Sequence, residues 1–290
     1  MTDVLARLRA LGVEFTPDQI AATRELFAAR VPGPGDVGAV VRRDLRYGPS
    51  ARNRLDVFSR PGAQGLPVVA FVHGGGFVQG DKGDEGAPFF NNFGAWAVRE
   101  GFVGVTVTYR LAPAHTWPSG PEDLEQAVAF LHGQVAADGG DPSRIVLVGQ
   151  SAGATHVASW LARQGCAEGS PTPIAGAAML SGIYDLELAG PTPMHDAYYG
   201  TNRALHARRS TLAALAATEV PCLFTIGELE PAFFQAQAAA LVAARWAACQ
   251  RYPEMHFLPG QNHVSSVMQL GSPTDGLGPL LADFVRRVCG

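Results

Sequence analysis

The sequence has little charge and almost no lysine. Charged residues make up 17% of its 290 residues, and Lys82 is the only lysine. Schiff-base chemistry and lysine-based phosphate clamps therefore have one candidate at most. The formal net charge is -4 and no basic patch is visible, so we expect no nucleic-acid partner.

Cysteines and long apolar runs are also scarce. No run reaches the roughly 18 apolar residues that a membrane-spanning helix needs. Charged residues interrupt the N-terminus, where a signal peptide would need an apolar stretch. The cysteines form neither a C-x-x-C pair nor a zinc-ligand spacing with histidine. We expect reduced, mostly buried thiols in a cytoplasmic protein; the four are Cys166, Cys222, Cys249 and Cys289.

Hydrophobic residues, by contrast, make up 47% of the chain, which is enough for a sizeable core. Near-continuous apolar runs alternate with helical patterns along most of the sequence. Such runs indicate strands covered on both faces, and the alternation predicts an α/β fold with a mostly parallel, doubly wound sheet. The predicted strands cover 67–72, 102–108, 145–148, 174–180, 222–226 and 255–258, and the predicted helices cover 119–135, 151–163, 231–249 and 277–288.

The N-terminal region has a different pattern. Residues 1–40 are predicted to be helical, and Thr16 to Gln19 form a capping-box start with proline at the first helical position. Two short runs, 42–47 and 54–58, predict an antiparallel pair at a sheet edge. Residues 41–290 would then form one catalytic domain.

The strongest functional motif is G-x-S-x-G at residues 149–153. It follows an apolar strand and precedes a helix, which is the context of a nucleophile elbow. We predict that Ser151 is a nucleophile at the carboxyl edge of the sheet, where a helix N-terminus favours developing negative charge. The alternative is a glycine-softened turn with a capping serine.

A second motif, His73 followed by three glycines and Phe77, comes directly after an earlier strand. An oxyanion hole is built at this place in such a fold. The expected donors are the backbone N–H groups of Gly75, Gly76 and Ala152. A dinucleotide-binding G-x-G-x-x-G does not fit, because its third glycine position is Gln79. His73 is interpreted as a residue that braces the loop.

The base and the acid are expected downstream, in the order serine, acid, histidine. His263 lies in a loop before the final helix and is the candidate base. Glu230 follows the strand at 222–226 and is the candidate acid, which would hold the imidazole in the required tautomer. Glu228 is the runner-up on position alone. Asp185 and Asp196 are weaker candidates.

These motifs, together with those at 109–113 and 141–145, resemble the α/β-hydrolase family. The closest resemblance is to carboxylesterases of the hormone-sensitive-lipase and feruloyl-esterase-like groups, over about residues 40 to 290. It implies an α/β-hydrolase fold with a serine nucleophile, no cofactor and small ester substrates. Two departures stand out: Glu230 replaces the aspartate of many relatives, and Ala154 replaces a further glycine.

The expected substrate site is less defined. By position, the N-terminal region resembles a small helical cap, and a cap-like insertion is expected at about 186–212. Phe77, Tyr184 and Tyr198 are candidate substrate-binding residues, with ordinary aromatic packing as the alternative. A small-molecule ester is the expected partner, and a homodimer is compatible with the sequence.

Two other functions stay open. The segments at 77–82 and 181–186 resemble arylformamidases of the same superfamily, which would cleave a C–N bond with the same triad. A non-catalytic small-molecule receptor on this fold is the other alternative. That reading normally requires the loss of a triad member, and both Ser151 and His263 are present.

Overall fold

The computed structural model describes residues 2–164 and 173–290, so Cys166 lies outside the described residues. In this part of the chain, eight strands form one sheet in the order β1-β2-β4-β3-β5-β6-β7-β8. Along this order, each strand from β4 onward is parallel to the next, whereas β2 is antiparallel to both β1 and β4. The predicted mostly parallel sheet with an antiparallel edge pair is therefore confirmed. The strands are β1 Val40–Arg46, β2 Arg54–Ser59, β3 Leu66–Val72, β4 Val103–Val107, β5 Gly140–Gln150, β6 Gly176–Leu180, β7 Cys222–Leu229 and β8 Glu254–Asn262.

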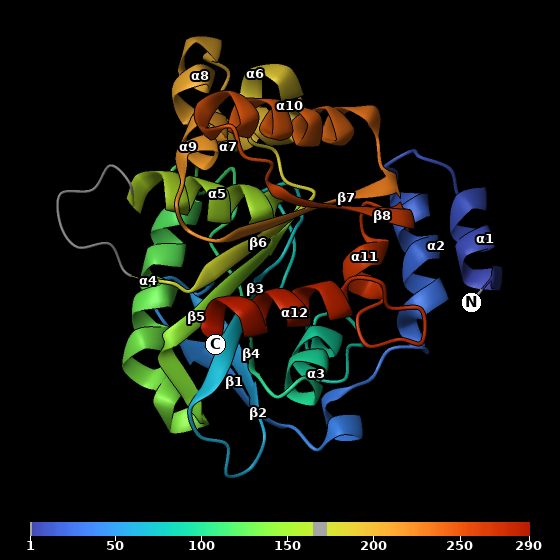
Figure 1. Cartoon of the computed structure of the whole chain (residues 1–290), viewed down its shortest axis with the longest axis vertical. Coiled ribbons are helices and arrows are strands. Elements are labelled where there is room, and N and C mark those ends of the chain that lie inside the picture. The colour runs from blue at the N-terminus through green and yellow to red at the C-terminus, as the bar shows by residue number, and fades with distance from the viewer. Residues whose placement is uncertain (1, 165–172) are drawn as a thin grey trace.

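Helices lie on both faces of this sheet, as Figure 1 shows. The main helices are α3 Asn91–Arg99, α4 Ser119–Gln134, α5 Ala152–Gln164, α10 Ala232–Cys249 and α12 Gly278–Cys289, with the short α11 Ser265–Met268. The four predicted helices agree with α4, α5, α10 and α12 to within one or two residues.

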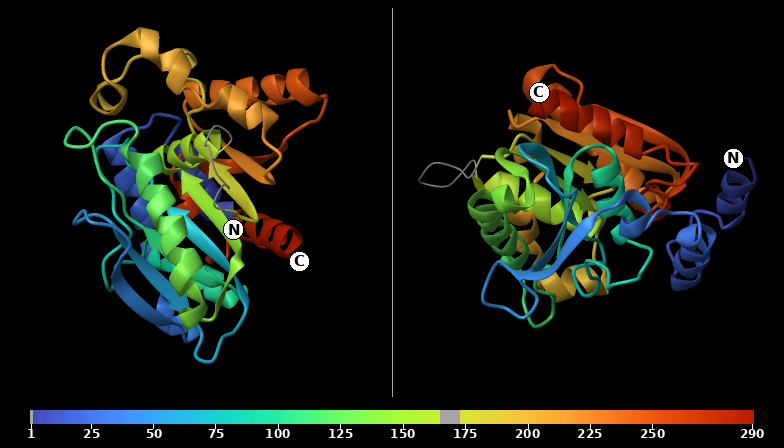
Figure 2. Two further views of the ribbon diagram at one scale, coloured as in Figure 1. Left: turned by 90° about the vertical axis from the view of Figure 1, so that its left-hand side faces the viewer. Right: turned by 90° about the horizontal axis from the view of Figure 1, so that it is seen from below.

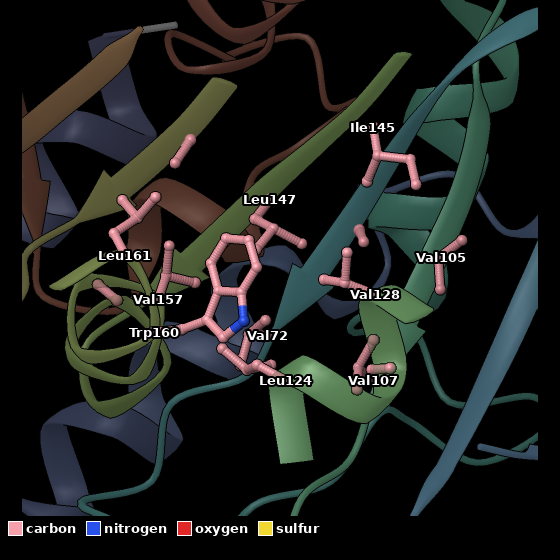
Figure 3. Packing of buried hydrophobic residues seen from close by; sticks show 14 of the residues in the cluster. Val72, Val105, Val107, Leu124, Val128, Ile145, Leu147, Val157, Trp160 and Leu161 are labelled. Carbon is pink, nitrogen blue, oxygen red and sulfur yellow. The ribbon is translucent and has the colours of Figure 1, made fainter. Parts of the chain in front are cut away.

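Alternating strand residues build a separate hydrophobic core on each face. On β3, Ala70 and Val72 pack in the cluster that includes α4, α5 and Trp160, part of which Figure 3 shows. Their neighbours Val69 and Phe71 pack in the cluster of α3 and α12. Because successive strand side chains point to opposite faces, a fully apolar strand needs both layers.

The N-terminal helices α1, Thr2–Ala10, and α2, Pro17–Ala28, lie beside β8 and α11 at one side of the molecule (Figures 1 and 2). The hydroxyl of Thr16 accepts a hydrogen bond from the Gln19 N–H, and Pro17 occupies the first turn. The predicted helix start is confirmed. Thr23 and Phe27 are fully buried, so the region is packed onto the domain.

The segment between β6 and β7, where a cap-like insertion is expected, folds into short helices. These helices and α10 lie together above the sheet in Figure 1. They are α6 Leu186–Ala189, α7 Pro193–Tyr199, α8 His206–Arg209 and α9 Leu212–Ala217.

The expectation of mostly buried thiols is only partly correct. Cys289 is buried and Cys222 is partly buried, whereas Cys249 is exposed at the end of α10. Among the described helices, none is both long and apolar enough to cross a bilayer.

Candidate active site

Ser151 occupies the sharp turn between β5 and α5. Its φ angle is +54°, a left-handed conformation that non-glycine residues seldom adopt. Its N–H donates to the carbonyl of Leu180 at the end of β6, at 2.9 Å, which fixes the turn to the neighbouring strand. The strained turn leaves the side-chain Oγ at the carboxyl end of the sheet, where the motif predicted it.

Glycines flank Ser151 because neighbouring backbone leaves no room for a side chain. A Cβ at Gly153 would lie 2.1 Å from the carbonyl oxygen of Val72, and one at Gly149 would lie 2.5 Å from the carbonyl oxygen of Gly153. Both distances are far below van der Waals contact. The G-x-S-x-G spacing is therefore a packing requirement of this turn.

A histidine and a carboxylate complete a hydrogen-bonded chain with Ser151. His263 directly follows β8, and its Nε2 lies 2.8 Å from the Ser151 Oγ. Its Nδ1 lies 2.7 Å from Oε2 of Glu230, which directly follows β7. His263 and Glu230 are at most 2% exposed. Three residues far apart in the sequence thus meet along one sheet edge.

Glu228, the runner-up acid, lies elsewhere. Its carboxylate accepts from the Gly260 N–H and pairs with Arg9 of α1, at 3.2 Å. These contacts lower the pKa of Glu228, with the hydrogen bond from Gly260 as the larger cause. The two weaker candidates also have other partners: Asp185 caps α6, and Asp196 pairs with Arg203.

The glycine loop after β3 lies against the serine turn. A Cβ at Gly74 would lie 3.2 Å from Cβ of Ser151. Gly75 and Gly76 have φ angles of +125° and +58°. Within the described chain, no recorded hydrogen bond uses the N–H of Gly75 or Gly76 as donor. Ala152 begins α5, where an N–H has no partner within the helix.

His73 braces this loop rather than reaching the serine. Its ring stacks on Tyr109 at 4.3 Å, and its Nδ1 lies 2.6 Å from the carbonyl of Gly74. Burial lowers the pKa of His73 to about 4. Arg52 supports the loop from outside by donating to the carbonyl of Gly80. A neutral, immobile His73 agrees with the sequence interpretation.

Two aromatic rings that the motifs did not indicate enclose His263. Phe234 of α10 stacks on its imidazole at 3.9 Å, and Phe15 approaches with its edge at 4.6 Å. Phe15 lies between α1 and α2. The adjacent Asn262 donates to Thr23 of α2 at 2.9 Å, so the N-terminal region also holds the histidine loop.

The predicted substrate-binding aromatics lie in the core. Phe77, Tyr184 and Tyr198 are at most 3% exposed. Phe77 stacks on Tyr198 at 4.8 Å, and Tyr184 packs edge-on against Phe224. These contacts correspond to the packing alternative, and a role in substrate binding stays a prediction.

Lys82 has a structural environment. Its Nζ pairs with Asp56 at 2.9 Å and with Asp44 at 3.1 Å, and its side chain is 7% exposed. Burial alone would lower the pKa of Lys82, but the two carboxylates outweigh it and raise the pKa. A permanently charged amine is unsuited to Schiff-base chemistry. Across residues 2–164 and 173–290, no cluster of His, Cys, Asp or Glu is arranged to hold a metal ion.

His156 is buried in α5 beneath the glycine loop. Its ring contacts Phe77, Tyr109 and Tyr198, and among the described residues neither ring nitrogen has a hydrogen-bond partner. Burial lowers the pKa of His156 to about 3. In the unfolded chain this histidine binds a proton near pH 6.5, whereas in the folded chain it stays neutral at that pH. The folded state therefore loses stability as the pH falls below about 6.5.

We therefore expect His156→Phe to make the protein less sensitive to acid. Urea unfolding measures the free energy of unfolding at pH 7 and at pH 5. Its decrease between these two pH values should be about 1 to 2 kcal/mol smaller in His156→Phe than in the wild type. His115→Phe, at an exposed position, serves as the control and should keep the wild-type pH dependence. An unchanged pH dependence in His156→Phe would contradict the assignment of a neutral buried ring.

Comparison with known proteins agrees with this architecture. A mutant of the esterase E40 aligns with a TM-score of 0.75 at 23% identity, over 99% of both chains. The chain has the α/β-hydrolase fold. Residues 55–176 match the BD-FAE family model. The fold expected from the motif resemblance is therefore confirmed.

Named esterases occur among the sequence relatives of this chain. It is 30% identical over 276 residues to Esterase LipQ of Mycobacterium tuberculosis (strain ATCC 25618 / H37Rv), over 86% of this chain. It is 42% identical over 120 residues to the Probable isoprenylcysteine alpha-carbonyl methylesterase ICMEL1 of Oryza sativa subsp. japonica, over 41% of this chain. The chain spans 64% of the length of the first relative and 27% of the second.

Proposed function

We propose that this protein is an α/β-hydrolase of the carboxylesterase type, a serine hydrolase with Ser151, His263 and Glu230 as its catalytic triad. The main support is the buried hydrogen-bonded chain from the Ser151 Oγ through His263 to Glu230, at 2.8 and 2.7 Å. The esterase names of its relatives support the ester as the substrate class.

In the proposed reaction, His263 Nε2 takes the Ser151 proton while Oγ attacks the carbonyl carbon of the ester. The tetrahedral intermediate collapses when His263 returns the proton to the leaving alcohol, which leaves an acyl group on Ser151. Water then gives a proton to His263 and attacks the acyl carbon, and the second tetrahedral intermediate collapses to the acid as His263 returns that proton to the Ser151 Oγ. Glu230 stabilises the imidazolium in both halves and accepts no proton itself.

The oxyanion is proposed to bind at the N–H groups of Gly75, Gly76 and Ala152. Two of these N–H groups belong to the glycine loop, whose Gly74 lies against Ser151, and the third is at the start of α5. A donor fixed in advance needs no reorganisation as charge develops, and removal of one such donor typically costs about 3 kcal/mol in the transition state.

The surroundings of the triad favour an uncharged substrate with an apolar group. Phe15, Phe233 and Met194 are between 37% and 41% exposed although they are apolar. Phe15 contacts His263, and Phe233 packs on Phe234 at 4.1 Å. A Cβ at Gly76 would lie 2.1 Å from Sδ of Met194, so this methionine covers the glycine loop. Apolar side chains thus lie on the histidine side and on the oxyanion side.

The N-terminal helices are proposed to act as a cap that supplies one wall of this site. We expect Phe15→Ala to lower kcat/KM for nitrophenyl esters by about three- to tenfold, because the ring contact with His263 is lost. Val13→Ala removes a nearby exposed side chain and is the matched control. Equal kcat/KM values for Phe15→Ala and wild type at every acyl length would argue against the cap.

The function is tested with a panel of nitrophenyl esters and an N-formyl aromatic amide, assayed on wild type and Ser151→Ala. Ester turnover that depends on Ser151 is the expected result. A formamide rate far above every ester rate would instead identify an arylformamidase-type C–N hydrolase. If the folded protein turns over neither substrate class, the receptor alternative gains support.

A further inference from the structure

The second oxygen of the Glu230 carboxylate has partners of its own. Oε2 faces His263, whereas Oε1 accepts a hydrogen bond from the Gly227 N–H at 2.8 Å and another from the hydroxyl of Ser181. Glu230 is 2% exposed and Ser181 is 4% exposed, so no bulk water competes for these contacts. Among the described residues, the carboxylate thus has three partners, of which Ser181 is the only hydroxyl.

Ser181 is held in an unusual backbone conformation at the end of β6. Its φ angle is +54°, and its N–H donates to the carbonyl of Thr225 on β7 at 3.1 Å. A non-glycine residue in this region is strained, and such strain persists where the surrounding structure imposes it. Here the strained turn directs a hydroxyl toward the carboxylate.

Gly227 shows how closely the acid is held. A Cβ at this position would lie 3.2 Å from Oε1 of Glu230 and 2.5 Å from the carbonyl oxygen of Gln261. Glutamate is one methylene longer than aspartate and has one more rotatable bond. Without fixed donors on Oε1, its carboxylate could rotate away from the His263 Nδ1.

We propose that Ser181 is a positioning residue that acts through Glu230. Its hydroxyl and the Gly227 N–H fix Oε1, and the carboxylate then presents Oε2 to His263 in the orientation that selects the reactive tautomer. This inference rests on the proposed triad. Ser181 does not itself touch the substrate or the reacting atoms.

The proposal is tested by removing the hydroxyl in two ways. Ser181→Ala and Ser181→Gly both lack it, but alanine keeps the strain that serine has in the left-handed backbone, whereas glycine relieves it. Both variants should lose about tenfold to hundredfold in kcat, with KM within about twofold of wild type. If the two variants lose kcat equally but differ in melting temperature, the loss of kcat comes from the missing hydroxyl and not from backbone strain.

A double-mutant cycle decides whether Ser181 acts through the acid. In a Glu230→Gln background, Ser181→Ala should lower kcat by a further factor of less than about three, because the carboxylate that Ser181 orients is gone. Fully additive losses, or a wild-type kcat in both single variants, would overturn the proposal.

Thr225→Val is the matched control for this experiment. It removes another buried hydroxyl, on the neighbouring strand, which has no hydrogen-bond partner among the described residues. Its kcat should stay within about twofold of wild type. The wild type also distinguishes the two proposals. If the wild type lacks Ser151-dependent turnover, the proposed function fails. If the wild type and the Ser181 variants are equally active, only the positioning role is refuted.

Discussion

Replacement of Ser151 by alanine should lower kcat for a nitrophenyl ester by about 10⁶-fold. The alanine side chain cannot form the acyl-enzyme, and His263 loses the Ser151 hydroxyl, which is the group that its Nε2 contacts. Residual turnover should come only from substrate binding and oxyanion stabilisation. Steady-state kinetics on purified variant, with the active sites of the wild type counted by titration, gives the ratio directly.

Ser159→Ala is the control within the same helix. Ser159 is buried in α5, two turns after the nucleophile, and its loss should leave kcat within about twofold of wild type. An organophosphonate should label the wild type and Ser159→Ala but not Ser151→Ala. A folded wild type that resists the label, or a Ser151→Ala variant that keeps its turnover, would refute a serine hydrolase mechanism.

Much of the fold could be predicted because its signals are local. The apolar run at 67–72 and the strand β3 differ by one residue at their start, and the helix that Thr16 caps begins at Pro17 as expected. Strand burial on both faces and helix capping depend on neighbours in the sequence, so a single sequence contains them.

Ser151 and His263 could be named for a related reason. Each lies immediately after a strand, and adjacent parallel strands end at the same edge of the sheet, so chain position alone brings such residues together. Strand position distinguishes Glu228 from Glu230 less clearly, because both lie near the end of the same strand. The register of β7 with β8 shifts between Gly227 and Leu229, an irregularity that strict alternation of strand side chains cannot anticipate.

The residues around the triad could not be predicted because their contacts join distant segments. Phe15 meets His263 only after the N-terminal helices dock beside β8, and the hydroxyl of Ser181 meets Glu230 across two strands. The aromatic character of Phe77 and Tyr198 suggested a pocket, but packing buried both rings. The local sequence around an aromatic residue does not show whether its ring will line a pocket or pack in the core.

Glu230→Gln should lower kcat by about 10⁴-fold, the scale typical of an amide in the place of a triad carboxylate. The amide has one oxygen, which the Gly227 N–H and the Ser181 hydroxyl would engage. Its NH₂ group would then face Nδ1 of His263 and require an acceptor there. The imidazole proton would move to Nε2, where it blocks transfer of the Ser151 proton.

The same substitution at Glu228 should change kcat by less than about twofold, because its carboxylate faces Gly260 and Arg9 rather than the imidazole. The pair between Arg9 and Glu228 is screened by solvent, with side chains 50% and 35% exposed, so its loss should have little effect on stability. Glu228→Gln thus removes the same charge with the same change of side chain, close to the same strand end, but it does not affect the tautomer of His263. A larger loss of kcat in Glu228→Gln than in Glu230→Gln would transfer the role of the acid to Glu228 and remove the basis for the positioning role of Ser181.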